Sequence, residues 1–186
     1  MTRQGGVHMR VFLMRHGEAQ PAEEAPRDED RALTDKGEAR LHKACRGLRR
    51  LEVFPERIFT SPLARAVQTA RIIAEELGFT GDVEAVDELS PTAPPEDMAE
   101  VLKSLAHEQV MLIGHQPYLG QLAGLLITAG ARGRVGIKKG GLARIDIDDW
   151  REAPPGEIRW LFTVKQLSWM KKKKKKAGDD EGLSDA

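Results

Sequence analysis

The feature that most constrains this sequence is the alternation of short apolar runs with amphipathic stretches at helical spacing. The run "MRVFLM" at residues 9–14 lacks polar alternation, which favours a strand covered on both faces, and residues 110–113 repeat that pattern. Strands of parallel sheets are buried in this way because helices lie on both sides of the sheet. We therefore expect an α/β protein with three α/β/α layers, a mostly parallel central sheet and helices on both faces.

Boundary signals accompany the expected helices. Thr34 is a candidate N-cap for the first helix, and Ser61 is one for the second, with Pro62 as the first helical residue and Gly78 after the last. The expected helices are residues 35–51, 62–77, 95–106 and a fourth beginning near 117. The expected strands are residues 9–14, 58–60, a weaker one within 81–91, 110–113, 141–147 and 157–164. The segment "DDWREAPPG" between the last two strands predicts an antiparallel pair.

The composition suits one folded domain with short extensions. Hydrophobic residues make up 40% of the chain, and 29 Lys and Arg balance 29 Asp and Glu, so the formal net charge is zero. We therefore expect no nucleic-acid partner, and no apolar run approaches the ~20 residues of a membrane helix, so we expect no membrane partner. Cys45 is the single cysteine, which excludes an internal disulfide, and we expect it to be a small buried helix residue.

Three segments are expected along the chain of 186 residues. Residues 1–8 form an N-terminal extension, residues 9–168 the folded domain, and residues 169–186 a disordered lysine-rich tail. The N-terminus lacks the apolar centre of a signal peptide, so we expect a cytoplasmic protein, and we expect a monomer.

Cationic side chains occur where three predicted strands end. Arg15 and His16 end the first strand, Arg65 lies in the first turn of the helix after the second, and His115 follows the strand at 110–113. Ligands of open α/β sheets bind outside the carboxyl ends of the strands, so we expect these four residues to form one site. Gly17 would let the backbone turn sharply beside them.

The position of Arg65 indicates an anionic ligand. A cation in the first turn of a helix opposes the positive end of the helix dipole, at a cost of a few tenths to ~1 kcal/mol. A bound anion would reverse that sign, with Arg65 and the backbone N–H groups near Ser61 and Leu63 as its ligands. A phosphoryl group suits two arginines and two histidines. The histidines show no metal-ligand spacing, so we expect neither a metal nor a cofactor.

A metal-free phosphoryl site favours a covalent route. The neighbouring arginines disfavour protonation of His16, so one ring nitrogen stays free to attack phosphorus. A phosphohistidine intermediate on His16 would divide hydrolysis into two displacements. Arg15, Arg65 and His115 would neutralise charge on the phosphoryl oxygens in both. No residue of this set carries the prediction alone, because a single histidine or arginine is more often structural; their joint placement carries it.

The sequence resembles the histidine phosphatase superfamily, which has the phosphoglycerate mutase-like fold. The resemblance covers about residues 9–164, and the order and spacing of four blocks fit as well as their content. The blocks are "MRHGEA" (14–19), "TSPLARAVQTA" (60–70), "DELSP" (87–91) and "IGHQPYLG" (113–120). The resemblance implies that His16 is the phosphorylated nucleophile and that Arg15, Arg65 and His115 complete the phosphate pocket.

Within the superfamily, the chain is most similar to the small SixA-type phosphohistidine phosphatases. The compact length, the "MRHGEA" start, "DRALTDKG" (30–37) and "GHQP" (114–117) carry this likeness. It implies a phosphatase that acts on protein phosphohistidine in signal transduction. Two alternatives stay open: hydrolysis of a small phosphorylated metabolite, such as a sugar phosphate or nucleotide, and binding of phosphate or a phosphoprotein without turnover. An intact His16 counts against the second.

The proton donor stays open at this point. Mutase-like relatives use the position of Glu88, although "DEL" matches their pattern only in part and Glu88 could equally be a solvent-facing carboxylate. Glu18 and Asp28 on the loop after His16 are alternatives. A phosphohistidine substrate could also need no donor, because its leaving group is an imidazole.

Specificity is expected from loops whose shapes the sequence does not give. They are residues 18–31, 90–95 and 129–141. The last of these carries four basic residues that either rim the pocket or, as is commoner in loops, lie in solvent; they are Arg132, Arg134, Lys138 and Lys139.

Overall fold

One six-stranded sheet forms the centre of the fold, with the strand order β3-β2-β4-β1-β5-β6. The computed structural model describes residues 9–128, 133–152 and 155–170. The strands are β1 (Met9–Arg15), β2 (Arg57–Thr60), β3 (Val83–Ala85), β4 (Gln109–Gly114), β5 (Leu142–Ile147) and β6 (Gly156–Phe162). Every strand expected from the sequence is present. The expected N-terminal extension, Arg132 and the tail beyond residue 170 lie outside the described residues.

The two central strands explain why their sequences are apolar without alternation. In β1, Val11 and Leu13 pack into the core on one face of the sheet, and Phe12 and Met14 pack into the core on the other. In β4, alternate residues divide in the same way between the two cores. Successive side chains of a strand point to opposite faces, so a strand between two helical layers needs apolar residues at every position.

The sheet is mostly parallel. β1 pairs in parallel with β4, and β2 pairs in parallel with both β3 and β4. β5 is antiparallel to β1 and to β6, which confirms the predicted antiparallel pair at the end of the fold. The chain therefore crosses outward from β1 to β2 and β3, then returns to place β4 beside β1.

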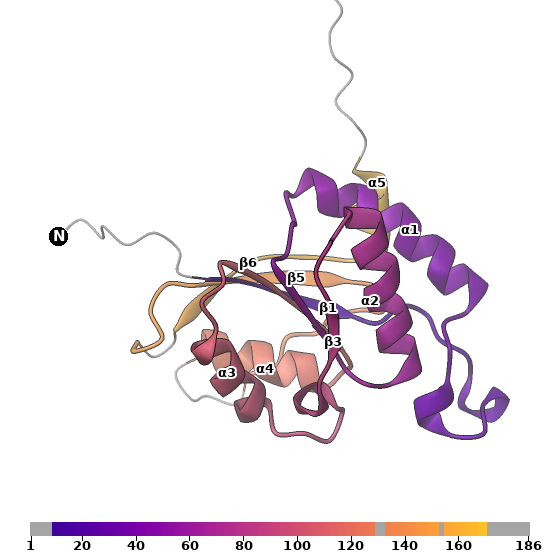
Figure 1. Cartoon of the computed structure of the whole chain (residues 1–186), viewed down its shortest axis with the longest axis horizontal. Helices are drawn as coiled ribbons and strands as arrows, with labels where there is room; N and C mark the ends of the chain where they lie inside the picture. The colour runs from indigo at the N-terminus through magenta and orange to yellow at the C-terminus, as the bar shows by residue number, and fades with distance from the viewer. Residues whose placement is uncertain (1–8, 129–132, 153–154, 171–186) are drawn as a thin grey trace, which may run out of the picture.

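In the described parts of the chain, five α-helices and three short 3-10 helices accompany the strands. They are α1 (Asp35–Arg50), α2 (Ala64–Leu77), α3 (Pro95–Ser104), α4 (Tyr118–Ile127), α5 (Val164–Trp169), η1 (Ala22–Glu24), η2 (Asp28–Asp30) and η3 (Asp87–Leu89). α1, α2 and α5 cover one face of the sheet, and α3 and α4 cover the other (Figure 1). This confirms the three-layer prediction. Among the helices of the described residues, none combines the length and apolarity needed to cross a membrane.

Most predicted helix boundaries are confirmed. The side chain of Thr34 accepts the N–H of Gly37 as the N-cap of α1. Gly78 ends α2 with φ of +66°, in the left-handed region that glycine adopts at low cost. Cys45 is fully buried in α1, as expected.

Two predictions at helix ends are wrong. α2 begins at Ala64 with Leu63 as its N-cap, so Ser61 is not the N-cap and Pro62 lies before the helix. The physical reason is that the Ser61 side chain is hydrogen-bonded to His115, as described below. The sequence analysis also missed α5, whose last residue, Trp169, is where the tail was expected to begin. A capping box between Thr163 and Gln166 starts this helix and is its sequence signal.

Candidate active site

The register of the parallel strands brings the predicted site residues to one level. Arg15 is paired with Gly114 across β1 and β4, and Thr60 is paired with Ile113 across β2 and β4. The residues that follow, His16, Ser61 and His115, therefore leave the sheet together at its carboxyl edge. The His16 N–H donates to the Gly114 carbonyl at 3.0 Å, and the two imidazole rings lie with centroids 5.0 Å apart. The two histidines that the sequence predicts to share one site therefore lie side by side.

The His16 ring is held by its own neighbour. Its Nδ1 lies 2.7 Å from the Gly17 carbonyl oxygen, and the residue is only 6% exposed. Because a carbonyl oxygen can only accept, Nδ1 carries the proton and donates it to Gly17. The lone pair is then on Nε2, the nitrogen that remains available to an incoming group.

The turn at Gly17 is fixed by close contacts. Its N–H donates to the Thr69 hydroxyl at 3.1 Å, and that hydroxyl donates to the Arg65 carbonyl at 2.7 Å. A Cβ atom at Gly17 would lie 2.8 Å from a methyl group of Leu41, so a side chain there would require the Leu41 side chain to shift. Thr69 thus joins the turn after β1 to the first turn of α2, a link that the sequence analysis did not foresee.

Arg65 is 6% exposed, contrary to the usual position of an arginine on a surface helix. Its Nη2 lies 2.9 Å from the Asp28 carboxylate, and its Nη1 donates to the Asp28 backbone carbonyl at 2.6 Å. The same carboxylate accepts from Arg31 at 2.8 Å, so Asp28 bridges two guanidinium groups. η2 therefore holds Arg65 through the side chain and the backbone carbonyl of Asp28.

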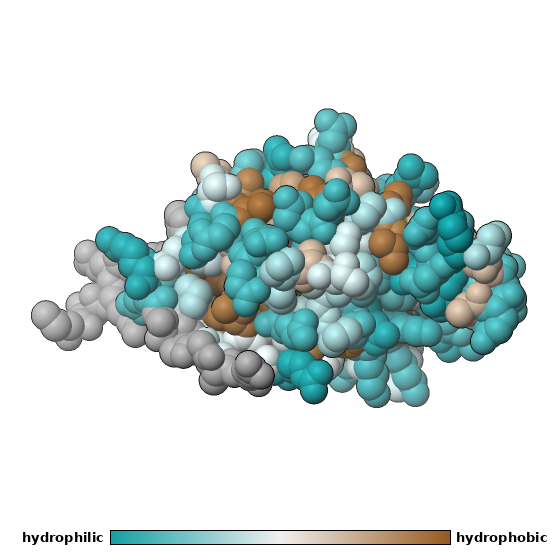
Figure 2. Space-filling view, turned by 90° about the horizontal axis from the view of Figure 1, so that it is seen from below, coloured by the Kyte–Doolittle hydropathy of each residue, from teal (hydrophilic) through white to brown (hydrophobic). Residues whose placement is uncertain are grey.

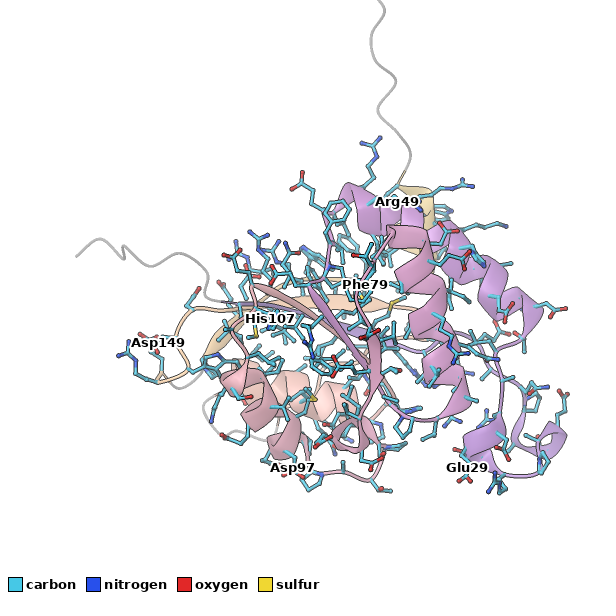
Figure 3. All side chains as sticks on the ribbon, in the orientation of Figure 1. Glu29, Arg49, Phe79, Asp97, His107 and Asp149 are labelled. Atoms are coloured by element: carbon cyan, nitrogen blue, oxygen red, sulfur yellow. The ribbon has the colours of Figure 1, made fainter. Side chains whose placement is uncertain are left out.

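The segment that carries Asp28 projects from the body of the molecule. Residues 22–30 form a protrusion with a mainly hydrophilic surface, at the right-hand end of the views (Figures 1 and 2). Figure 3 places Glu29 on this protrusion. The side chain of Asp28 is 61% exposed although its partner Arg65 is buried, so the ion pair lies where the protein interior meets solvent.

Arg15 is half-buried and is held by the segment before β5. Its Nη1 donates to the Ile137 carbonyl at 3.1 Å, and its buried Nε has no hydrogen-bond partner within the described residues. The Gly140 N–H contacts the backbone carbonyls of both Arg15 and His16, at 3.1 and 3.0 Å. Lys138 and Lys139 are exposed beside this contact. The expected basic loop therefore lies against the backbone of the site.

Burial and positive charge keep both histidines neutral. The pKa of His16 is lowered to about 3, mainly by burial, with the charges of His115, Arg65 and Arg15 acting in the same direction and the hydrogen bond to Gly17 opposing them. Burial likewise lowers the pKa of His115 to about 4, with Arg65 and Arg15 acting in the same direction and Asp28 in the opposite one. These influences also show that both arginines lie near both rings.

Two parts of the predicted anion site are already used within the protein. The Ser61 N–H donates to the Ile113 carbonyl at 2.9 Å, so its assignment as an anion ligand is wrong. The Leu63 N–H faces the Ser61 hydroxyl at 3.4 Å. The predicted anion ligands that remain are therefore side chains: two guanidinium groups and two imidazoles.

The three candidate proton donors have different surroundings. Glu18 pairs with Arg40 and Lys36 of α1. Asp28 is bonded to Arg31 and Arg65, and these bonds hold the pKa of its carboxyl below the usual range, so it is ionised at neutral pH.

Glu88 lies half-buried in η3, where its backbone carbonyl accepts from the Tyr118 hydroxyl. Within the part of the chain that the structure describes, its carboxylate forms no hydrogen bond or ion pair. No group of three or more His, Cys, Asp or Glu side chains there is placed to hold a metal ion.

Comparisons with known proteins show which family and which structures the chain is similar to. Residues 11–92 match the model of the family described as the histidine phosphatase superfamily (branch 1). An uncharacterized protein of Picosynechococcus sp. is 34% identical over 141 residues, which cover 72% of this chain and 82% of that protein.

Solved structures are similar over most of their length. The structure of the protein histidine phosphatase SixA complexed with tungstate has a TM-score of 0.77 and 27% identity, covering 86% of this chain and 99% of that one. The alpha-ribazole phosphatase of Shigella flexneri has a TM-score of 0.66 at 19% identity, covering 84% of this chain and 97% of that one, a likeness of fold.

Proposed function

Because this chain belongs to the histidine phosphatase superfamily, it is a phosphatase, and we propose that it acts without a metal through a covalent phosphohistidine intermediate on His16. The observation that carries the proposal is the Nδ1 contact of His16 with the Gly17 carbonyl at 2.7 Å. It leaves an unprotonated Nε2 beside two arginines and a second histidine. A ring nitrogen with a free lone pair in a cationic pocket is suited to attack phosphorus.

The reaction divides into two displacements at phosphorus. In the first, the His16 Nε2 lone pair forms a bond to phosphorus while the bond to the leaving atom breaks, and the leaving atom keeps that electron pair and takes up a proton. In the second, water attacks phosphorus, the electron pair of the P–N bond returns to Nε2, and inorganic phosphate leaves. Arg15, Arg65 and His115 stabilise the charge on the phosphoryl oxygens in both transition states.

The substrate we propose is a phosphohistidine side chain of another protein. The structural likeness to SixA supports this choice, together with the absence of a neutral carboxylic acid at Asp28. Cleavage of a P–N bond releases an imidazole, which can accept its proton from solvent. Hydrolysis of a small phosphomonoester is the second candidate, and it is favoured by Glu88, whose carboxylate forms no ion pair with any other described residue and could protonate a leaving oxygen.

One set of experiments tests both the intermediate and the substrate. The protein is incubated with a 32P-phosphohistidine peptide and quenched in alkali, and we expect acid-labile label on His16 that is lost in His16→Ala. Glu88→Gln should lower turnover of phosphomonoesters about 10²-fold or more but that of the peptide less than tenfold. Asp87→Asn, the neighbouring exposed position of η3, is the control and should change neither. Full activity of His16→Ala on every substrate would overturn the mechanism.

A further inference from the structure

A buried serine is paired with the second histidine of the site. The Ser61 Oγ lies 2.8 Å from His115 Nε2, and Ser61 is fully buried. The same hydroxyl faces the backbone N–H of Leu63 at 3.4 Å, and no other partner contacts it within the described residues. The Ser61 hydroxyl has no part in the mechanism above, and the helix-cap role expected for Ser61 is wrong.

Counting hydrogens fixes the direction of the bond. The Ser61 oxygen accepts from Leu63, so its own hydrogen needs an acceptor, and a buried hydroxyl without one costs about 1–3 kcal/mol. His115 Nε2 is the acceptor within reach, which requires that Nε2 carry a lone pair and Nδ1 the proton. A neutral imidazole is required for this, and the lowered pKa of about 4 keeps His115 neutral above that pH.

We propose that Ser61 is a positioning residue that holds His115 in the Nδ1-protonated tautomer, so that this N–H donates to an oxygen of the bound phosphoryl group. The inference rests on the proposed function for the identity of the anion. In this arrangement, His115 stabilises the anion as a neutral hydrogen-bond donor and needs no additional proton to do so.

The two histidines are then fixed through different ring nitrogens, Nδ1 in His16 and Nε2 in His115. The Gly17 carbonyl uses the N–H of His16 and leaves its lone pair for phosphorus. The Ser61 hydroxyl uses the lone pair of His115 and leaves its N–H for a phosphoryl oxygen. The two imidazole rings, whose centroids are 5.0 Å apart, thus present a nucleophile and a hydrogen-bond donor to the same phosphoryl group.

The test is the protonation state of the His115 ring, measured by 15N NMR on the protein labelled at histidine. In the wild type we expect a pyrrole-type Nδ1 and a pyridine-type Nε2. Ser61→Ala should move His115 toward the Nε2-protonated form, and it should weaken binding of inorganic phosphate about tenfold or more, the loss expected for a hydrogen bond to a charged group. Thr60→Val is the matched control, because within the described residues its buried hydroxyl hydrogen-bonds only to the Ser61 carbonyl.

Either of two results overturns the inference. One is a wild-type His115 protonated on Nε2, a measurement that does not depend on any variant folding. The other is a Ser61→Ala protein with unchanged tautomer and unchanged phosphate affinity. A His115 that is protonated on Nδ1 in a protein that never becomes phosphorylated on His16 would instead leave this inference standing and overturn the proposed mechanism.

Discussion

His16 and His115 are buried next to two guanidinium groups, and their protonation is the chemical state on which the site depends. Desolvation is the largest cause of both lowered pKa values, so the neutral rings are a property of the folded chain. An exposed histidine titrates near 6.5 and would be partly charged in weakly acidic solution. These two rings stay neutral through that range because protonation would bury a charge beside other cations.

The first prediction concerns stability against pH. Below pH 6.5 the unfolded chain binds a proton on each of these histidines, whereas the folded chain does so only near pH 3 and 4. The free energy of unfolding should therefore fall as pH is lowered from 6.5 to 4, by up to about 1.4 kcal/mol per pH unit per ring. Urea unfolding at several pH values measures this slope. A His16→Gln, His115→Gln double variant should flatten it, and an equal slope in that variant would contradict the assignment.

Asp28 is the second residue whose charge bears on the site. It binds both terminal nitrogens of Arg65, through its carboxylate and its backbone carbonyl. A phosphoryl anion and the Asp28 carboxylate therefore compete for the same guanidinium. Because the carboxylate is largely exposed, the free energy of its ion pair with Arg65 is modest, about 0.2–1 kcal/mol.

We expect Asp28→Asn to bind inorganic phosphate roughly 1.5- to 5-fold more tightly, because the competing charge is removed. Isothermal titration calorimetry measures the change. Asp30→Asn, on the same 3-10 helix but paired with Arg27, is the control and should bind phosphate like the wild type. Weaker binding by Asp28→Asn would show that the carboxylate supports the pocket instead of competing with its ligand.

α5 shows how the last element of the fold is attached. It packs on α1, where the buried Gly47 allows the two backbones to approach closely. A Cβ atom at Gly47 would lie 2.5 Å from the Leu167 carbonyl oxygen and 2.8 Å from its Cα. Leu167 itself is fully buried in the core beneath α1 and α2. The short helix thus closes one side of the core that supports β1.

Gly47→Ala tests this contact. Alanine favours an isolated helix by up to ~1 kcal/mol, but the added methyl group must push α5 away, and we expect a net loss of about 1–3 kcal/mol in the free energy of unfolding. Arg46→Ala, the preceding exposed position of α1, should change it by less than ~0.5 kcal/mol. Chemical denaturation compares the two. A stabilised Gly47→Ala protein would mean that α5 does not lie against α1.

The layered architecture was predictable because periodicity distinguishes buried strands from amphipathic helices along most of the chain. α5 was missed because six residues are too few to show a periodic pattern, and only the Thr163–Gln166 capping box marks it. The strand order could not be read from the sequence, since it depends on pairings between distant segments. These pairings decide which side of β1 each later strand occupies.

The site was predictable to the extent that it follows one rule about strand ends. Arg15, His16, Arg65 and His115 were expected together on that rule. The contacts of Ser61 with His115 and of Thr69 with Gly17 were not, because they arise from strand register and from the seating of α2. The Asp28 pairing with Arg65 depends on the path of an irregular loop, for which the sequence holds no periodic signal.

β1 lies between β4 and β5 and is covered on both faces, and the proposed nucleophile follows its last residue. Amides in such a strand exchange with deuterium only when the whole domain opens, whereas those of a peripheral segment exchange through local fraying. The proposed nucleophile, His16, is thus attached to the strand whose amides we expect to exchange most slowly. Asp28, in contrast, lies on the exposed protrusion of residues 22–30. We expect replacement of this protrusion to change the contacts of Arg65 and to leave the position of His16 unchanged.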